Sequence, residues 1–395
     1  MNILHINTID IRGGAAKACQ RLVNEQKKRG HTVSTFVGYK YSNDPTVHKI
    51  PLNPLYYKMS NFFANDLCFS RSNWILKTDK YKKADVIHCH NIHSGFFNLK
   101  TLETISKEKP TVWTLQDMWA ITSGSTDSYH LKTEKPRRFC KILWDNRKYL
   151  LEQKKKIYKN SRFTVVTSSQ WMAKNVEKSI LSHLDHRLIL NGIDLSIFNP
   201  KNKVKTRKEL NLPEKKKIAL FIAVGGIVDL LKGSSYVEQI ANVYKKDGTK
   251  LFVAIGGKKN STSTKTSNQN IFQTGYISDE KLLAKYYGMA DFFLYPSRAD
   301  NSPLVVSEAM ACGTPVVSFE TDGIPEMVSN CGLLAKRESL EDLKVKVNQM
   351  FSISPKEYSK MCDSGIERTK QKYSIEKMAN EYFALYSEII SKFKQ

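Results

Sequence analysis

Short apolar runs alternate along the chain with stretches in which apolar residues recur at three- and four-residue spacing. The chain opens with an apolar run at 2–7, then Gly13-Gly14, then a helix-period stretch at 17–29 that ends at Gly30. A strand, a turn of small residues and a helix are typical of the start of a parallel α/β unit. Further strand-like runs lie at 31–37, 85–90, 110–115 and 163–168. The first half is therefore predicted to form a doubly wound sheet.

The same alternation restarts after a polar, lysine-rich stretch at 200–217. Strands are predicted at 217–224, 251–255, 271–274, 292–295 and 314–319, with helices at 279–287 and 303–311. The tail at 374–394 is predicted as one amphipathic helix, and Asn191-Gly192 is a turn signal between the halves. We expect an α/β protein with two Rossmann-like doubly wound domains, 1–192 and 193–375, that face each other across a cleft. The helix at about 376–395 is a candidate to pack back on the first domain.

The charge is large and unevenly distributed. The 395 residues include 62 Lys+Arg and 38 Asp+Glu, for a net charge of +24, and residues 1–194 hold +16 of it. Such an excess favours an anionic partner, which is nucleic acid, an anionic membrane surface or an acidic substrate. Nucleic acid is disfavoured because the sequence has no zinc-finger spacing, RNP motif or basic zipper.

The cysteine spacing and the hydropathy pattern indicate in which cellular compartment the protein resides. The seven cysteines are scattered and never spaced C-x2-C, which argues against a disulfide framework and a zinc ribbon. The sequence has no apolar run of about 18 residues, and Asp10 and Arg12 interrupt the start where a signal peptide is apolar. We expect a cytoplasmic protein, and peripheral contact with the inner face of the cell membrane is left open.

Residues 50–83 mix aromatic side chains with lysines and arginines. The rings and cations considered are Tyr56, Tyr57, Phe62, Phe63, Phe69 and Trp74 with Lys58, Arg71, Lys77 and Lys80. Such a mixture is typical of an interfacial contact with an anionic membrane. A helix whose aromatic residues belong to the core is the alternative interpretation, and the sequence does not decide between the two.

The stretch from Tyr276 to Val317 is the most specific part of the sequence. It includes YPSRADNSPL at 295–304 and SEAMACGTP at 307–315, and it resembles the retaining nucleotide-sugar glycosyltransferases of family 4. The resemblance implies the GT-B fold and transfer of a hexose from a UDP- or GDP-sugar, without a cofactor or a metal. Residues 88–93 and 112–119 resemble the branch involved in bacterial cell-surface polysaccharide synthesis. A cell-envelope glycan or an anionic, lipid-linked glycan is then the implied acceptor.

The residues that would bind the donor follow from this resemblance. The turn formed by Asn301, Ser302, Pro303 and Leu304 leads into a helix that is predicted to start at about Pro303. The backbone N–H groups of this turn suit a diphosphate, and Pro303 is the one member that has no N–H. By resemblance Glu308 would accept hydrogen bonds from the ribose, and Asp300, where the family has Glu, would lie near the transferred sugar. Asp300 as a cap of the helix at 303–311 is the alternative. Lys232 would neutralise the diphosphate.

Other donor positions depart from the family or are less specific. Gly226 stands where the family commonly has an arginine, and Lys258 is a candidate to replace that cation. The turn with Tyr276 and Ile277 resembles the one that binds the nucleobase through backbone groups. These positions complete the predicted donor site in the second domain.

The first domain supplies the remaining candidates. Gly13 and Gly14 resemble the glycine-rich loop beside the donor. Gln116 stands where this branch usually has histidine, and it is expected to contact the donor without acting as a base. His90 and His93 are candidates for acceptor contact; no adjacent carboxylate supports a metal there, and none is predicted.

The departures at Gln116 and Gly226 keep a second function open. A catalytically weakened family member could act as a non-enzymatic partner or scaffold of another glycosyltransferase. A nicotinamide enzyme is disfavoured, because the chain lacks G-x-G-x-x-G followed by a ribose-binding acid.

Overall fold

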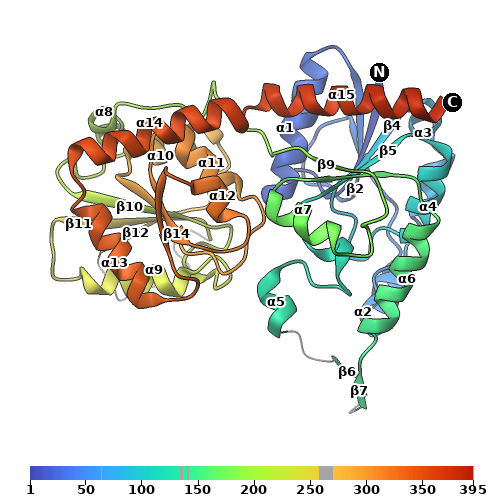
Figure 1. Ribbon diagram of the computed structural model, residues 1–395, viewed down its shortest axis with the longest axis horizontal. Coiled ribbons are helices and arrows are strands. Elements are labelled where there is room, and N and C mark those ends of the chain that lie inside the picture. Colours follow the sequence, from blue (N-terminus) through green and yellow to red (C-terminus); the bar gives the residue numbers. More distant parts are fainter. Residues whose placement is uncertain (64, 134–136, 140–141, 258–269, 395) are drawn as a thin grey trace. The chain divides into compact units, whose positions relative to one another are not determined.

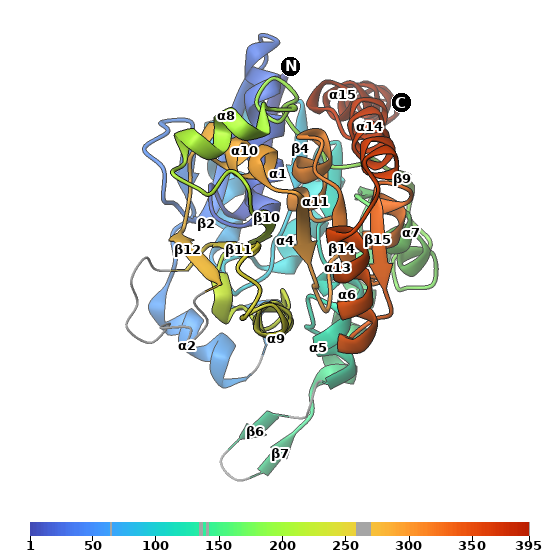
Figure 2. The ribbon, with the colours of Figure 1, turned by 90° about the vertical axis from the view of Figure 1, so that its left-hand side faces the viewer.

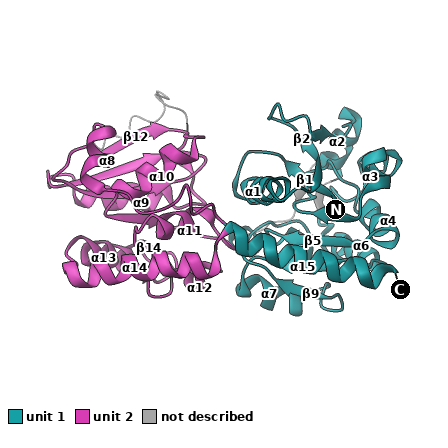
Figure 3. Cartoon of the chain, turned by 90° about the horizontal axis from the view of Figure 1, so that it is seen from above, with its two compact units in different colours: residues 1–192, 375–395 teal, residues 193–374 magenta. Residues whose placement is uncertain are grey.

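Two parallel sheets, one in each of two units, form the framework of the computed structural model (Figure 1). The structure describes residues 1–394 apart from 64, 134–136, 140–141 and 258–269. Unit 1 comprises Met1–Gly192 and Ile375–Gln395, and unit 2 comprises Ile193–Ser374 (Figure 3). Two α/β units with parallel sheets confirm the predicted fold class.

The sheet of unit 1 has seven strands in the order β3-β2-β1-β4-β5-β8-β9. Their bounds are β1 (Asn2–Ile9), β2 (Thr32–Tyr39), β3 (Val47–Lys49), β4 (Val86–Cys89), β5 (Thr111–Leu115), β8 (Thr164–Thr167) and β9 (His186–Leu188). Every neighbouring pair is parallel. The order reverses between β1 and β4, which is where open α/β sheets bind ligands.

Helices cover both faces of this sheet. The helices of unit 1 are α1 (Gly14–Lys28), α2 (Pro54–Phe62), α3 (Asp79–Lys83), α4 (Leu99–Glu108), α5 (Ser128–Thr133), α6 (Arg147–Lys159), α7 (Gln170–Glu177) and α15 (Ile375–Lys394), with 3-10 turns η1 (Ser72–Lys77) and η2 (Trp119–Ile121). Alternate residues of β1 point to opposite faces: Ile3 packs with α1 and α15, whereas Leu4 and Ile6 pack with α4 and α6. Each face therefore has its own apolar core.

The C-terminal helix α15 completes unit 1. Its apolar stripe, with Met378, Tyr382, Leu385 and Tyr386, is buried against α1 and the sheet. The chain enters and leaves unit 2 side by side, because the Ile193 amide donates to the Tyr373 carbonyl at 2.8 Å. Unit 1 is thus built from two separate segments of sequence.

The sheet of unit 2 has six parallel strands in the order β12-β11-β10-β13-β14-β15. They are β10 (Lys217–Ile222), β11 (Lys250–Ile255), β12 (Ile271–Gly275), β13 (Phe292–Tyr295), β14 (Val316–Phe319) and β15 (Gly332–Ala335). The helices are α8 (Lys203–Glu209), α9 (Ser234–Val243), α10 (Glu280–Met289), α11 (Leu304–Ala311), α12 (Ile324–Val328), α13 (Leu340–Phe351) and α14 (Pro355–Lys372), with the turn η3 (Gly226–Val228). Residues of α9 and α13 share one apolar cluster with alternate positions of the strands.

Strands β6 (Arg137–Phe139) and β7 (Ile142–Trp144) form an antiparallel pair outside the two sheets. In Figures 1 and 2 this pair extends away from the sheet of unit 1. Among the described residues, we find no helix with the length and apolar character that crossing a bilayer requires.

Candidate functional site

In unit 2 the strand order reverses between β10 and β13, and the loops after these strands carry the predicted donor residues. The loop after β10 contains Gly226 and Lys232 and leads into α9. The loop after β13 contains Asp300 and leads into α11. The two loops are joined by a hydrogen bond from the Arg298 amide to the Leu231 carbonyl at 2.9 Å. The topology therefore brings residues about 70 positions apart in sequence together at one sheet edge.

Lys232 and Asp300, both half-buried, form a polar cluster with the buried Tyr295 at this edge. The Lys232 ammonium forms an ion pair with the Asp300 carboxylate, and the Tyr295 hydroxyl donates to Asp300 Oδ2 at 2.6 Å. Burial alone would lower the pKa of Lys232, but the charge of Asp300 outweighs it and raises that pKa. Lys232 is therefore a fixed cation, held by a carboxylate that an anionic ligand could replace.

Gly233 explains how the two loops approach so closely. Its φ of +82° lies in the left-handed region, and a Cβ there would lie 1.9 Å from the Pro296 carbonyl oxygen. No other residue fits this position without a shift of backbone. The glycine after Lys232 thus sets the distance between the lysine and Asp300.

Two helix N-termini begin in these loops without a side-chain cap. They belong to α9, whose cap is Gly233, and α11, whose cap is Pro303. Sequence patterns predicted Pro303 inside the first turn of the helix, but its ψ of 118° is extended and the helix begins at Leu304. The buried hydroxyls of Ser234 and Ser302 lie beside these N-termini and have no hydrogen-bond partner among the described residues. Uncapped N-termini with unpaired donors suit a phosphate group.

Glu308 is buried in α11 and only 2% exposed. Its Oε2 accepts a hydrogen bond from the Tyr287 hydroxyl at 2.9 Å, which ties α11 to α10. Asn301 is also buried in the preceding loop. Asp300 and Glu308 thus each accept a hydrogen bond from a tyrosine, and Asp300 pairs in addition with the Lys232 cation.

Gly226 leaves no room for the arginine that the family commonly has. Its φ is +63°, and a Cβ would lie 2.6 Å from the Gly256 carbonyl oxygen. Lys258, considered as a substitute cation, lies outside the described residues. The exposed Tyr276 and the half-buried Ile277 follow β12, and the Tyr276 amide donates to the Gly257 carbonyl at 3.1 Å.

In unit 1 the glycine-rich loop lies at the end of β1. Gly13 caps α1, and a Cβ at Gly13 or Gly14 would meet no atom within 4 Å, so this loop borders open space. Nearby, the Asp10 carboxylate accepts hydrogen bonds from the Tyr41 and Ser42 amides at 2.9 and 2.8 Å. Burial opposes ionisation of Asp10, but these hydrogen bonds outweigh it and lower its pKa.

His90 is buried inside unit 1 and lines a small pocket with His93, Gln116 and Asp117. It is 2% exposed, and its Nε2 lies 2.9 Å from Nδ1 of His5, whose Nε2 lies 2.8 Å from the Gln26 side-chain oxygen. His88 Nδ1 lies 2.6 Å from the Tyr386 hydroxyl of α15. Burial lowers the pKa of His5 to about 4 and holds the pKa of His88 and His90 well below the usual value. These rings are neutral and link the sheet to α15.

A metal site in this cluster has little support. His5, Cys19 and His90 bring one potential ligand atom each within 4.8 Å of one another. Both ring nitrogens of His5 are already in hydrogen bonds with Gln26 and His90. Burial raises the pKa of the Cys19 thiol to about 12, so it is not a ready thiolate ligand.

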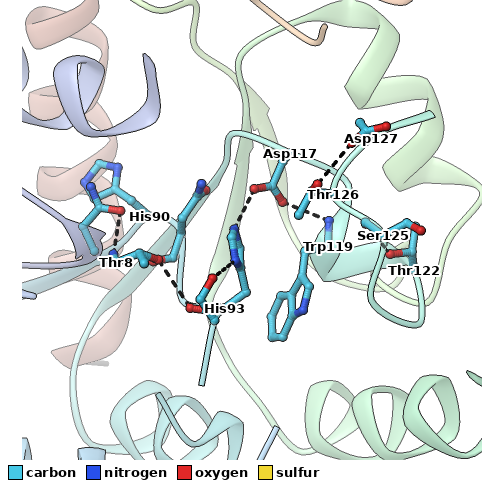
Figure 4. A network of polar contacts seen from close by, with 12 residues as sticks. Thr8, His90, His93, Asp117, Trp119, Thr122, Ser125, Thr126 and Asp127 are labelled. Atoms are coloured by element: carbon cyan, nitrogen blue, oxygen red, sulfur yellow. Dashed lines mark hydrogen bonds and ion pairs between the residues drawn. The ribbon is translucent and has the colours of Figure 1, made fainter. Parts of the chain in front are cut away.

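His93 is half-buried, whereas His90 is buried. Figure 4 shows the polar contact of His93 with Asp117. Its Nε2 lies 2.9 Å from Asp117 Oδ2, and its Nδ1 lies 2.8 Å from the Ser94 hydroxyl. Burial would lower the pKa of His93, but the hydrogen bond and charge of Asp117 raise it. Sequence reasoning found no carboxylate beside these histidines, because Asp117 follows a different strand and reaches His93 only in the folded sheet.

The loop that carries Asp117 is held from behind by α6. The Lys154 ammonium donates to the carbonyls of Trp119 and Thr122, and it lies 3.6 Å from the centroid of the Trp119 ring. Burial lowers the pKa of Lys154 to about 7, although Asp66 and Asp117 oppose this shift. The position of Asp117 thus depends on a completely buried amine.

Gln116 forms a reciprocal amide pair with Asn191. Each side chain donates to the other at 3.0 Å. An imidazole has one donor and one acceptor on opposite sides of its ring, so the usual histidine could not make both bonds. The glutamine that replaces the usual histidine at position 116 therefore binds the Asn-Gly turn at the end of unit 1 through Asn191.

The structure thus adds Tyr295, Tyr287, Asp117, Asn191 and Lys154 to the predicted residues. Tyr287, Tyr295 and Asp117 lie within the sequence stretches that carried the family resemblance, so proximity in sequence could have indicated them. Lys154 could not have been distinguished from its neighbours in the run Lys154-Lys155-Lys156.

Comparisons with known proteins agree with this architecture. Residues 12–197 match the model of Glycosyltransferase Family 4, and residues 219–352 match that of Glycosyl transferases group 1. Sucrose-phosphate synthase from Thermosynechococcus elongatus superposes with a TM-score of 0.74 at 19% identity, over 99% of this chain and 100% of that one. Anabaena HepE in complex with UDP gives 0.70 at 14% identity, over 98% and 100%.

Two parallel-sheet units of this kind define the GT-B class of glycosyltransferase folds. The chain belongs to the glycosyltransferases of family 4. It is 25% identical to the putative colanic acid biosynthesis glycosyl transferase WcaC of Escherichia coli K12, over 98% of this chain and 100% of that protein. It is also 25% identical to an uncharacterized 41.2 kDa protein in the cps region of Klebsiella pneumoniae, over 98% and 99%.

Proposed function

We propose that this protein is a metal-independent, retaining hexosyltransferase of polysaccharide biosynthesis. It takes a sugar from a nucleotide diphosphate donor and transfers it to a hydroxyl of a cell-envelope glycan or a lipid-linked acceptor. The observation that carries the proposal is the Lys232 cluster beside two uncapped helix N-termini. Relatives support the donor and pathway: HepE was solved with UDP and with UDP-glucose, and WcaC is named for colanic acid biosynthesis.

The donor diphosphate is assigned to unit 2. Its negative charge takes the place of Asp300 as the partner of Lys232, while the amides at the starts of α9 and α11 and the free hydroxyls of Ser234 and Ser302 donate to its oxygens. Asp300, released from the lysine, is then available to the transferred sugar. Glu308 is assigned to the ribose, and Tyr276 and Ile277 to the base.

Transfer needs no strong protein base in this proposal. The bond from the anomeric carbon to the diphosphate oxygen breaks, and its electron pair leaves with the diphosphate. The acceptor oxygen bonds to the same face of that carbon, and its proton passes to an oxygen of the departing diphosphate. Lys232 and the helix N-termini stabilise the charge that develops on the leaving group.

Acceptor contact is assigned to unit 1, at His93 and Asp117 instead of the buried His90. The raised pKa of His93 favours an imidazolium whose Nε2 pairs with Asp117. Its Nδ1–H can donate to a hydroxyl or an anionic group of the acceptor in place of the Ser94 hydroxyl. The positive excess of unit 1 supports an anionic acceptor or membrane surface.

The first experiment measures nucleotide binding by thermal shift with UDP and GDP. A nucleotide at a hundred times its dissociation constant should stabilise the protein by about 2.7 kcal/mol. We expect Lys232→Ala to lose most of this shift, since the diphosphate loses the half-buried cation that pairs with it. Lys281→Ala removes an exposed lysine of α10 in the same unit and should keep the shift.

The second experiment incubates the protein with UDP- and GDP-sugars and measures released nucleoside diphosphate. Release by the wild type, but not by Lys232→Ala or Glu308→Ala, supports the enzyme. Binding without release supports instead the catalytically weakened scaffold. The two departures from the family pattern, Gln116 in its amide pair and the crowded Gly226, are the reason to test that alternative. If neither nucleotide shifts the wild type, the donor assignment is wrong.

A further inference from the structure

Two acidic residues of unit 2 have a left-handed backbone conformation. Asp322, in the loop after β14, has a φ of +48°, and Glu338, in the loop after β15, has a φ of +59°. Residues with a side chain adopt this region at a cost in free energy, whereas glycine adopts it freely. Strained residues of this kind persist where the surrounding contacts hold them, and they gather at functional sites. The contacts of these two residues lead to the loop that carries Asp300.

Asp322 holds the backbone of Asp300. Its Oδ2 accepts a hydrogen bond from the Asp300 amide at 3.2 Å. The amide of the next residue, Gly323, donates to the Asp300 carbonyl at 3.2 Å. Both backbone polar groups of Asp300 therefore bond to the dipeptide 322–323, and the position of Asp300 is fixed without the use of its own carboxylate.

Arg337, two residues after β15, joins Asp322 to the same loop. Its Nη1 lies 3.4 Å from Asp322 Oδ1, and its Nη2 donates to the Arg298 carbonyl at 2.7 Å. The Asp322 side chain is only 4% exposed, so its charge needs this cation. Arg298 in turn forms an ion pair with Glu338 at 3.3 Å. Asp322, Gly323 and Arg337 thus form a brace, named here the Asp322 brace, that holds segment 298–300.

Asp300 needs such a support in the proposed function. Its carboxylate pairs with Lys232 and accepts a hydrogen bond from the Tyr295 hydroxyl. Once the donor diphosphate becomes the partner of Lys232, that ion pair no longer fixes Asp300. The contacts of the Asp322 brace with Asp300 are to its backbone, so they leave its carboxylate available to the transferred sugar. Precise support matters because a misplacement of about 1 Å can cost roughly a hundredfold in rate.

We propose that Asp322 and Arg337 are positioning residues, which keep Asp300 directed at the transferred sugar after the diphosphate has displaced it from Lys232. The inference rests on the proposed function and deepens it, since it adds two residues that act on the donor only through Asp300. The left-handed strain at Asp322 is then explained, because glycine would fit the backbone more easily but has no carboxylate for the Asp300 amide.

A role in stability alone is the alternative, and Asp322→Gly separates the two. Glycine relieves the left-handed strain and removes the carboxylate of the brace in the same substitution. If the brace only stabilises the loops, the melting temperature, nucleotide binding and activity should change together. If it positions Asp300, the turnover rate should fall while folding and nucleotide binding are retained.

Release of UDP or GDP from the nucleotide sugar that the wild type cleaves is the kinetic test. We expect Asp322→Gly to lower kcat by about tenfold to a hundredfold, with KM changed by about twofold or less. Asp322→Asn keeps an acceptor oxygen and should recover most of kcat. The matched control is Asn211→Gly, which replaces another left-handed residue of unit 2, with a φ of +54°, and should leave kcat unchanged.

A double variant tests whether Asp322 and Arg337 act as one unit. Arg337→Ala should lower kcat about as much as Asp322→Gly, because Asp322 then lacks the cation that holds it. The two substitutions combined should lower kcat no further, since both break the same support. Effects that multiply in the double variant would contradict a shared role.

Hydrogen exchange measured by mass spectrometry tests the brace without relying on activity. A peptide over 296–304 contains the Asp300 amide, and saturating UDP is present throughout. We expect faster deuterium uptake in this peptide for Asp322→Gly and Arg337→Ala, and wild-type uptake for Asn211→Gly. Unchanged uptake in Asp322→Gly overturns the brace. Faster uptake with the kcat of the wild type overturns the positioning role.

The inference and the function on which it rests fail in different ways. If the wild type shows no thermal shift with UDP or GDP and releases neither, the transferase is wrong, and the positioning role is lost with it even where exchange confirms the contacts. If the wild type releases nucleotide and Asp322→Gly does so equally well, the transferase stands and the positioning role alone is wrong. A parallel loss of melting temperature, nucleotide shift and kcat in Asp322→Gly would identify the stabilising role instead.

Discussion

Lys154 gives unit 1 a pH-dependent stability. Its pKa is about 7 in the folded protein against 10.5 for an ordinary lysine, so the unfolded chain binds more protons between these pH values. The free energy of unfolding should therefore rise as pH increases from about 7 toward 10.5. We expect Lys154→Met to remove this rise, measured as the melting temperature at several pH values.

The control is Lys156→Met, which changes an exposed lysine two residues along the same helix. It should keep the wild-type pH profile. An identical profile for Lys154→Met and the wild type would show that the buried amine is not the cause.

Gly226 should not tolerate even one added carbon. Its left-handed φ and the approach of the Gly256 carbonyl mean that Gly226→Ala must shift backbone, and we expect a loss of about 2 kcal/mol or more in a urea titration. Gly248→Ala places the same methyl group where no atom lies within 4 Å, and it should cost about 0.5 kcal/mol or less. Equal losses for the two variants would contradict the steric account.

At the scale of the element, α15 is tied to unit 1 by buried polar groups as well as by its apolar stripe. Tyr386→Phe would leave His88 Nδ1 and the Gln26 amide without their shared hydroxyl. We expect unit 1 to lose about 1 to 3 kcal/mol in chemical denaturation. Tyr149→Phe on the exposed side of α6 is the control and should change the free energy of unfolding little. If this control lost as much stability as Tyr386→Phe, the buried hydrogen bonds of Tyr386 would not be the cause of the loss.

The regular elements could be predicted because their patterns are long or repeated. The helix at 374–394 was expected from its apolar stripe, and the structure gives α15 as Ile375–Lys394. The edge strands β3 and β9 were missed because each has three residues, too few to show a period. Residues 50–83 fit neither single interpretation: Ile75 and Tyr81 are in the core, whereas Leu55 and Phe62 are exposed.

The candidate site was less accessible to sequence reasoning, because its geometry comes from contacts between distant segments. Lys232 and Asp300 could each be identified, but their ion pair depends on the close approach at Gly233. His90 and His93 appeared equivalent in sequence. They are three residues apart at the end of β4. In the fold, the His90 ring lies among His5 and His88, whereas the His93 ring lies beside Asp117.

At the scale of the whole molecule, the two units differ in how the sequence builds them. Unit 2 is one continuous segment with its own apolar core, whereas unit 1 needs residues 375–395 to cover one face of its sheet. A fragment of 193–374 is therefore expected to unfold cooperatively and to keep the thermal shift with UDP or GDP. A fragment of 1–192 should lack a cooperative transition, measured by circular dichroism; a sharp transition in it would show that α15 is dispensable.

The return of α15 to the first unit also sets an order of events during synthesis on the ribosome. The face of the unit 1 sheet that α15 covers stays exposed while residues 193–374 are translated. At roughly 5 to 20 residues per second, that interval lasts about 10 to 40 s. Unit 2, although it emerges second, can finish folding first, and the nascent first unit is the species that needs protection by a chaperone.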